Sequence, residues 1–379
     1  MERRKRLLNN LNIFIPVVVL LIIIIGIIAI GSAVEVNNSG SGGDAFVKRQ
    51  IVAAVLGIIF AFLLQFNDYR IFSSYAVIIY GGTVSLMALI FFLGKYSGSS
   101  GRWIMLGPLN FQPAELSKLV TVIMLAEVLS RNQDRLKYFV GFFKPFLIMV
   151  IPFGLILLQS DLGTALVMIF IFIVMMFVAG CNWKYLTLIF GGALLILVLV
   201  IMAHYFFGTP VPFLREYQLN RLVVFINPGV DPHGTGYNII QSKIAVGSGE
   251  LFGKGLYGGT QNQLDFLPEK HTDFIFSVIG EEFGFLGVIF LLGLYCVLLW
   301  QLIGVAIRAR DTYGQLLVSG ITALYFFHIL ENVGMTMGVM PITGIPLPFV
   351  SYGGTFMITC LIGIGLVINV NIRRRKIAF

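Results

Sequence analysis

The residues with the clearest chemical potential lie in the segment FLPEKHTDFIFSVIGEEFG, at positions 266–284. Its Asp273 directly precedes a long apolar run, so we expect this carboxylate at a membrane boundary. Partial removal from water raises the pKa of a carboxyl group toward the range that suits a general base. Thr272 or Asp273 could instead serve only as the N-cap of the following helix, because both residue types accept hydrogen bonds from free backbone N–H groups. The spacing alone leaves both interpretations open.

A second group of charges lies inside or between apolar runs, where ionisable side chains are rare and usually functional. Glu115 and Lys118 are three residues apart, so they share one face of a helix and can pair. They could contact a substrate, or form an ion pair that joins two helices. Asp161, in QSDLGT between two apolar runs, is more readily explained as a helix N-cap than as a reacting group.

Cations are spread through the segment that precedes Asp273. The cations that could together hold a pyrophosphate are Arg215, Arg221, Lys243 and Lys254, because charge-assisted hydrogen bonds suit phosphate oxygens. Cations of surface segments are also often merely solvated, so each of these four is a weak prediction by itself. For the neighbouring lone His271 we expect a structural role rather than metal binding.

The composition indicates whether these groups are surrounded mainly by water or by lipid. The chain is 58% hydrophobic and only 12% charged, whereas a soluble domain carries about 25% charged residues. The net charge of +8 arises from cations distributed along the chain between apolar runs, so we do not expect nucleic-acid binding. The three cysteines are far apart and have no CxxC spacing, which favours neither a disulfide framework nor a metal site.

Apolar runs of about the length that crosses a bilayer recur through the whole chain. They predict an all-α polytopic membrane protein with about ten transmembrane helices and one domain over residues 1–379. The expected helices are near 11–32, 51–66, 72–94, 114–130, 143–159, 161–180, 185–207, 274–300, 314–336 and 351–371.

The cations also predict orientation, because cationic loops are retained in the cytoplasm. More than half of the 26 lysines and arginines fall on one side if both termini are cytoplasmic. The long segment at about 208–273, between the seventh and eighth helices, is then extracytoplasmic. Its Gly/Pro-rich sequences favour turns over regular structure, and a loop of this length is usually functional.

Four separated blocks carry a resemblance to a known family. This sequence resembles the SEDS proteins of shape, elongation, division and sporulation, and within them the elongation branch more than the division branch. Two departures are visible: Ser160 stands where the family usually has Pro, and Glu250 where a third Gly is common. The blocks are GRWIMLGPLNFQPAELSKL (101–119), QSDLGTA (159–165), NPGVDPHGTGYNIIQSKIAVGSG (227–249), which runs on to the Asp273 segment, and MPITGIPLPFVSYGG (340–354).

The resemblance implies a peptidoglycan glycosyltransferase of the cytoplasmic membrane that polymerises lipid II on the outer leaflet during elongation. It also implies a complex with a class B penicillin-binding protein, a transpeptidase. Asp273 matches the essential acidic residue of the family, Glu115 and Lys118 match its intramembrane pair, and Arg221 matches its arginine after the YQ pair. A Mg²⁺ or Mn²⁺ ion near Asp273 is compatible with this chemistry, although no ligand set is visible in the sequence.

The implied reaction assigns roles to these groups. Asp273 would take the proton of the acceptor hydroxyl, and a base opposite the leaving group gives inversion. Arg215, Arg221 and Lys243 would stabilise the departing polyprenyl pyrophosphate. The rival interpretations are a flippase for the lipid-linked precursor, for which Asp161 and the intramembrane pair would form a polar path, a division-type member of the family, and a noncatalytic scaffold. Polymer synthesis in detergent, where no second compartment exists, discriminates between synthesis and transport.

Overall fold

The computed structural model describes most of the chain. The described residues are 13–35, 43–97, 101–106, 109–207, 221, 223–232 and 234–374. Predicted site residue Arg215 lies outside this described part.

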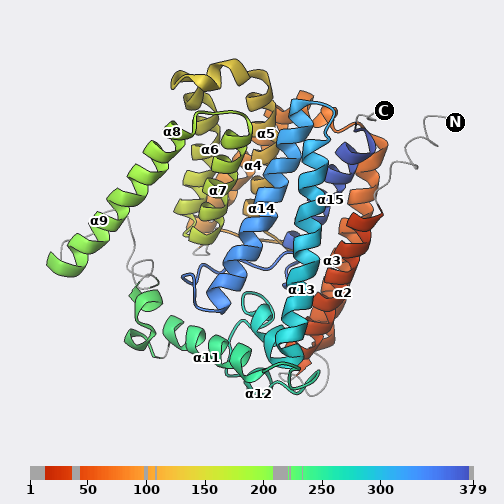
Figure 1. The fold of residues 1–379 in the computed structure, drawn as a ribbon, viewed down its shortest axis with the longest axis vertical. Coiled ribbons are helices and arrows are strands. Elements are labelled where there is room, and N and C mark those ends of the chain that lie inside the picture. The colour runs from red at the N-terminus through yellow and green to blue at the C-terminus, as the bar shows by residue number, and fades with distance from the viewer. Residues whose placement is uncertain are drawn as a thin grey trace.

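The helical prediction is confirmed by the arrangement in Figure 1, in which long helices form one bundle. Nine of them are α2 (Phe14–Glu35), α3 (Gly43–Leu63), α4 (Arg70–Ser97), α5 (Pro113–Arg131), α6 (Val140–Leu158), α7 (Leu162–Val178), α13 (Ile275–Ile307), α14 (Thr312–Thr336) and α15 (Gly354–Ile372). The remaining predicted span consists of α8 (Trp183–Leu186), a π-helical turn η3 (Thr187–Gly191) and α9 (Gly192–Phe207). Figure 1 shows this last segment diverging from the bundle.

Length and composition qualify seven of the described helices as membrane-spanning. The apolar helix α7 is shorter than these seven, with 17 residues, and α5 contains several charged side chains. Both lie within the bundle, because α5 and α7 pack against each other and against α14. The buried charges of α5 therefore lie in the interior of the helical bundle, where such groups can find partners.

Two predictions need correction. The segment 208–273 is not only turns: in its described part a 14-residue helix, α11 (Thr235–Ser248), follows a short turn η4 (Pro228–Val230), and α12 (Thr260–Gln263) follows α11. Glycines at both ends of the α11 sequence obscured the apolar positions that bury it. The all-α prediction also has one exception among the described residues, an antiparallel hairpin of β1 (Ile104–Leu106) and β2 (Leu109–Phe111).

Ion pairs join the turns at one end of the bundle. At one end, Arg70 of α4 pairs with Asp311 at 2.7 Å, and Arg373 after α15 lies 3.6 Å from Asp68. These contacts bring the α3–α4 turn, the α13–α14 turn and the end of α15 together, as the predicted cytoplasmic face requires. The segment with α11 and α12 lies across the opposite end (Figure 1).

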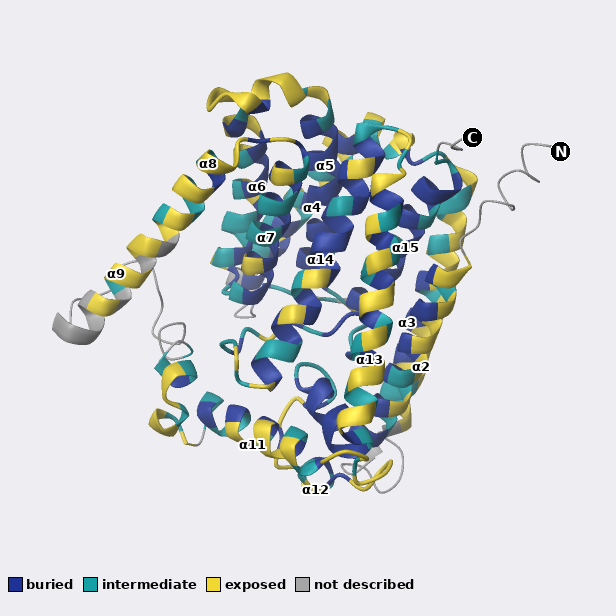
Figure 2. Ribbon diagram, in the orientation of Figure 1, coloured by how far each residue is buried: buried dark blue, intermediate teal, exposed yellow. Residues whose placement is uncertain are grey.

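Burial identifies the centre of the bundle. Figure 2 shows α14 and α15 mostly buried, whereas α8–α9 and the outer faces of α3 and α13 are largely exposed. Many of the residues exposed there are apolar. In a bilayer such exposed apolar faces contact lipid rather than water. The central helices α5, α14 and α15 are therefore rigid supports for polar side chains at their ends.

The connections at the ends of these helices complete the described elements. Short 3₁₀ turns follow α3 and α5, namely η1 (Leu64–Phe66) and η2 (Gln133–Lys137). Residues 337–353, between α14 and α15, contain no helix or strand. This last connection, called the α14–α15 loop below, lies at the same end as α11 and α12 and forms part of the site.

Candidate active site

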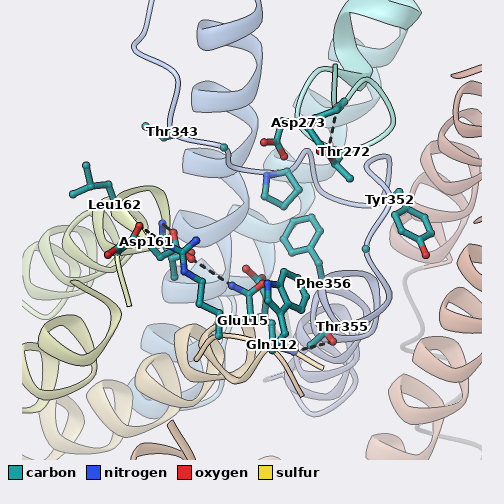
Figure 3. Close-up of a pocket in the computed structure, with 18 of the residues that line it drawn as sticks. Gln112, Glu115, Asp161, Leu162, Thr272, Asp273, Thr343, Tyr352, Thr355 and Phe356 are labelled. Carbon is teal, nitrogen blue, oxygen red and sulfur yellow. Dashed lines mark hydrogen bonds between the residues drawn. The ribbon is translucent and has the colours of Figure 1, made fainter. Parts of the chain in front are cut away.

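A cavity of about 360 Å³ lies at the end of the bundle that carries α11 and α12, the end predicted to be extracytoplasmic. Its walls come from the hairpin region, the start of α5, the α6–α7 turn, the residues before α13 and the α14–α15 loop (Figure 3). Four of the predicted site residues line it together: Glu115, Asp161, Arg221 and Asp273. These residues are up to 158 positions apart in the sequence, so only the folded bundle unites them.

Asp273 directs its carboxylate into this cavity (Figure 3). The expectation that Thr272 or Asp273 caps α13 is wrong, because the N-cap position is Phe274 and no side chain bonds there. Burial, and after it the charge of Glu269, raise the pKa of Asp273 from its ordinary value of 3.8 to about 6, while Thr272 and Arg221 partly oppose the rise. A carboxylate with this pKa is suited to accept a proton near neutral pH.

The backbone before Asp273 is fixed by the α14–α15 loop. The His271 carbonyl accepts a hydrogen bond from the Tyr352 N–H at 3.0 Å, and the Thr272 carbonyl accepts one from Ser351 Oγ at 2.6 Å. The His271 ring packs edge-on against Phe46, consistent with the structural role expected for it. Consecutive carbonyls held in this way restrict the direction of the next side chain.

Gly344 gives the carboxylate its space. Its φ is +75°, which favours glycine, and an added Cβ would lie 3.2 Å from Asp273 Oδ2. A Cβ at Gly163 of α7 would lie 2.8 Å from the Thr343 carbonyl of the same loop. Two glycines therefore allow α7, the loop and the catalytic candidate to approach closely.

Arg221 supplies positive charge to the cavity. Its Nη1 donates to the Thr343 carbonyl at 3.3 Å, and its charge favours the ionised form of Asp273. Lys243 is not among the residues that line the cavity: it is exposed on α11, and its chain lies against Gly338. Of the three described cations in the predicted set of four, the structure therefore brings Arg221 alone to the site.

Arg102 is a cavity residue that sequence reasoning missed. Its guanidinium donates to the Gln159 carbonyl at 2.5 Å and to the Ser160 carbonyl at 2.8 Å, and Trp103 lines the cavity beside it. Both residues belong to the first of the four sequence blocks, but nothing in their local sequence predicts contact with the α6–α7 turn. Ser160 has a φ of +62°, which a proline ring cannot adopt, so this turn differs from one with Pro at that position.

Asp161 is a helix cap, as predicted, and also a wall of the cavity. Its Oδ1 accepts from the Thr164 N–H at 3.1 Å, which satisfies a free donor at the start of α7. Its Oδ2 accepts from Gln112 Nε2 at 3.4 Å. The side chain thereby connects the first residues of α5 and α7.

The Glu115–Lys118 pair is confirmed. Lys118 Nζ lies 2.9 Å from each oxygen of the Glu115 carboxylate, and the lysine is 1% exposed. Lys118 Nζ also lies 3.0 Å from His328 Nε2, while His328 Nδ1 lies 3.0 Å from the Pro346 carbonyl. We infer that Nδ1 carries the proton, because this leaves Nε2 free to accept from the ammonium group. The chain of bonds joins α5 through α14 to the α14–α15 loop.

The space beside this pair is small. Beneath Glu115, the pocket next to Lys118 measures about 10 Å³, room for about one water molecule. Glu331 of α14 is also buried and accepts a hydrogen bond from Thr343. The described polar side chains below the cavity therefore form hydrogen bonds with one another.

The described residues contain no group of three or more His, Cys, Asp or Glu arranged to hold a metal. The carboxylates of Asp273 and Glu269 both line the cavity. Magnesium is often bound by one or two carboxylates together with substrate phosphates. The donor set fits that shared mode of binding, and does not form an all-protein metal cage.

Fold and cavity together define a multi-pass membrane protein with an acidic and basic site at one end of its bundle. The profile of the family described as cell cycle protein, which covers FtsW, RodA and SpoVE, matches residues 12–376. The chain therefore belongs to this family, the SEDS proteins.

Relatives of known name span nearly the whole chain. The Escherichia coli K12 peptidoglycan glycosyltransferase MrdB is 34% identical and covers 90% of both chains. The Treponema pallidum peptidoglycan glycosyltransferase RodA is 32% identical, with 98% of this chain and 100% of the relative covered. A probable peptidoglycan glycosyltransferase FtsW of Geobacter sp. strain M18 is 37% identical, with 93% and 94% covered.

Solved structures give the same relationship. A RodA structure from Thermus thermophilus is 32% identical, with a TM-score of 0.69 and 97% of this chain and 98% of that chain covered. A second structure, which describes structural coordination of polymerization and crosslinking by a peptidoglycan synthase complex, is 35% identical. Its TM-score is 0.78, and 97% of this chain and 99% of that chain are covered.

Proposed function

We propose that this protein is a peptidoglycan glycosyltransferase that polymerises lipid II into glycan strands at the outer face of the cytoplasmic membrane. The observation that carries the proposal is the convergence of Asp273, Arg221, Asp161 and Glu115 on one cavity at the outer end of the bundle. Relatives named for this activity match over almost the whole chain, which supports it. Because both RodA and FtsW relatives occur, the elongation role rests on the sequence blocks discussed above.

Asp273 is the general base of the proposed reaction. The acceptor sugar hydroxyl attacks the anomeric carbon of the lipid-linked donor, and its proton passes to the Asp273 carboxylate. The bond from the anomeric carbon to the pyrophosphate oxygen breaks as the glycosidic bond forms. With the base opposite the leaving group, an α-linked donor gives a β-linked product.

Arg221 stabilises the polyprenyl pyrophosphate that leaves. A guanidinium matches phosphate oxygens with directed hydrogen bonds, and it acts most strongly where water is excluded. Arg102 adds a second positive charge to the cavity wall. Lys243 and Arg215 belong to the preceding outer segment, where they could meet the substrate before it enters.

Glu115 and Lys118 form the floor of the proposed substrate site. Glu115 lines the cavity and Lys118 neutralises it from below, so the floor presents a polar but nearly uncharged surface to the substrate. Their bonds through His328 to Pro346 also support the wall that contains Gly344.

A Mg²⁺ or Mn²⁺ ion is a further proposal. Glu269 would hold it near Asp273 together with the pyrophosphate, and it would supply neutralising charge to the leaving group. Removal of divalent ions should then lower the polymerisation rate, and added Mg²⁺ or Mn²⁺ should restore it. Activity unaffected by a chelator would exclude the ion from the reaction.

A class B penicillin-binding protein is the proposed partner. The related complex couples polymerization with crosslinking, and a membrane-embedded polymerase needs a transpeptidase to join its strands. We expect the purified chain to make polymer only, or mainly, when this partner is present. A partner-independent rate equal to that of the complex would count against the proposal.

The alternative is a flippase for the same lipid-linked precursor. Glu115, Lys118 and Asp161 were the residues that suggested a polar path across the membrane. The mutual pairing of Glu115 and Lys118, with space for about one water beside them, favours a closed support over such a path.

Polymer synthesis in detergent separates the two functions. Purified full-length protein with its partner is incubated with labelled lipid II, and Asp273→Ala and Glu115→Ala are compared with wild type. We expect long glycan strands from wild type and none from folded Asp273→Ala. If Asp273→Ala polymerises at the wild-type rate, the proposed mechanism is wrong. If wild type makes no polymer beside an active relative, transport or scaffolding is favoured instead.

A further inference from the structure

A buried amide connects the Asp273 segment with the wall that faces it. Asn332 lies on α14 and is 0% exposed. Its Nδ2 donates one hydrogen bond to the Asp273 carbonyl and another to the Ile345 carbonyl, each at 2.8 Å. One side chain therefore uses both of its amide hydrogens to hold two separate segments.

The two segments are those whose separation determines the position of the Asp273 carboxylate. Ile345 directly follows Gly344, whose Cβ position lies 3.2 Å from Asp273 Oδ2. A shift of either segment would move the carboxylate relative to the cavity. The Asn332 amide is attached to a long buried helix, so it provides a rigid reference for both.

We propose that Asn332 is a positioning residue that sets the distance between the Asp273 segment and the α14–α15 loop during polymerisation. This inference rests on the proposed function, because it assumes that Asp273 reacts with the acceptor. Asn332 acts through two backbone carbonyls and does not line the cavity. A misplacement of about 1 Å can slow a reaction about 100-fold while substrate contacts elsewhere remain.

The fold contains a matched control in Asn369 of α15, which is also 0% exposed. Its Nδ2 donates to the carbonyls of Leu64 at 2.5 Å and Asn67 at 2.9 Å, and its Oδ1 accepts from the Tyr69 N–H. These contacts lie at the opposite end of the bundle from the cavity. Replacement of Asn369 by leucine removes more hydrogen bonds than replacement of Asn332, so a general loss of stability should be larger in the control.

The experiment compares wild type, Asn332→Leu and Asn369→Leu in the complex with the partner protein. For each, kcat and KM for labelled lipid II, lipid II binding and thermal unfolding in detergent are measured on folded, monodisperse protein. Asn332→Ser, which keeps one hydroxyl donor, is included in case Asn332→Leu does not fold. Asp273→Ala provides the reference kcat for complete loss of the base.

We expect kcat to fall about 100-fold in Asn332→Leu and less in Asn332→Ser, with KM and lipid II binding within about threefold of wild type. Asn369→Leu should retain nearly wild-type kcat per folded molecule. The inference is overturned if the Asn332 variants keep wild-type kcat, or if both leucine variants lose activity only in proportion to their loss of folded protein. A wild-type protein without polymerase activity would instead overturn the proposed function, and with it this role of Asn332.

Discussion

Asp273 lies between opposing electrostatic influences. Desolvation and the Glu269 charge favour the neutral acid, while Thr272 and Arg221 favour the carboxylate, and the resulting pKa is about 6. Such a balance allows the carboxylate to be ionised before the reaction and still able to hold a proton afterwards. The same balance makes its behaviour testable by pH.

The polymerisation rate should rise with pH through about 6, because the base acts in its ionised form. Glu269→Gln should move this rise to lower pH, since the Glu269 charge raises the pKa of Asp273. Asp134→Asn, at an exposed carboxylate of the opposite end, is the control and should leave the profile unchanged. A pH profile identical in wild type and Glu269→Gln would contradict the assignment.

Stability should show the complementary effect. The pKa of Asp273 is higher in the folded protein than its ordinary value of 3.8, so ionisation at higher pH costs stability that is retained below about pH 4. Asp273→Asn removes this cost. Its unfolding temperature should exceed that of wild type at pH 8, and the difference should shrink as the pH falls through about 6. An equal difference at every pH would show that Asp273 does not titrate as described.

Glu250 is a residue whose backbone disfavours its side chain. Its φ is +49°, a conformation that costs a non-glycine residue about 1 kcal/mol. Glu250→Gly should therefore be neutral or stabilising by up to about 1 kcal/mol, even though glycine has greater freedom in the unfolded chain. Glu250→Ala keeps the strain and should bring no gain. Thermal unfolding of both variants in detergent tests this, and equal effects would refute it.

At the scale of single residues, the sequence could predict the groups with unusual surroundings. Asp273, Glu115 and Lys118 were visible because charge beside or within an apolar run needs a reason. Arg102 was not visible, because an arginine before a turn is ordinary until the fold brings the α6–α7 turn against it. Asn332 could not be found either, since its partners are backbone carbonyls that no side-chain pattern specifies.

At the scale of elements, the α14–α15 loop is the part that builds the site. It has no helix or strand, yet its backbone and side chains fix the carbonyls before Asp273 and its Pro346 carbonyl meets His328. Support comes from α14 on one side and the start of α7 on the other. Glycines at which two segments approach closely therefore indicate the position of the site better than apolar residues do.

Gly344→Ala should abolish most polymerisation, because the added Cβ would lie 3.2 Å from Asp273 Oδ2 and the φ of +75° is strained for alanine. Gly180→Ala is the matched control: its φ is +87°, but the space around its Cβ position is open. Both variants should lose similar stability, about 1–2 kcal/mol. Polymerisation assays should find a strong loss only in Gly344→Ala, and equal activity of the two variants would contradict this role of Gly344.

The Glu115–Lys118 pair joins α5 to α14 through His328, so its disruption should affect the whole bundle. Lys118→Met leaves a buried carboxylate without its cation and should destabilise the protein by about 3–5 kcal/mol. Lys48→Met breaks an exposed pair with Asp44 and should cost about 0–1 kcal/mol. Unfolding in detergent measures both. A similar small cost at the two sites would mean that the intramembrane pair is not a structural link.

Helix positions were predictable because each apolar run has the length of a bilayer and polar residues separate the runs. The second helix begins at Gly43, whereas the prediction placed its start near 51. The predicted start was too late because the first turns contain Asp44 and two cations, which are unusual in a membrane span. The helix α11 was missed for a different reason: glycines flank its apolar positions, and glycines favour turns in a sequence-based prediction. Local composition caused both errors, whereas packing in the folded protein determines where these two helices form.

At the scale of the whole molecule, one end carries the cation-rich turns and the other carries the cavity. This polarity places the α11–α12 segment and Asp273 outside if the cationic turns face the cytoplasm. A lipid-linked substrate could then keep its tail beside the exposed apolar helices while its sugars enter the cavity. The Arg70–Asp311 and Arg373–Asp68 contacts indicate that the turns at the cation-rich end form one compact face.

Cysteine labelling tests this orientation. A cysteine at Leu264, which is 64% exposed, should react with a membrane-impermeant maleimide while the cytoplasmic membrane is intact. A cysteine at Lys137, whose side chain is 71% exposed, should react only after permeabilisation. Wild type supplies the background from the three native cysteines. The reverse pattern would invert the topology and remove the cavity from the outer face.

The most direct test of the central claim is the rate of glycan polymerisation from labelled lipid II by the full chain with its partner, for wild type and for Asp273→Asn. Asparagine keeps the size of the side chain but cannot accept the proton. We predict that Asp273→Asn binds lipid II within about threefold of wild type, unfolds at an equal or higher temperature at pH 8, and makes no polymer. Polymer formed by Asp273→Asn at a rate near that of wild type would contradict the account.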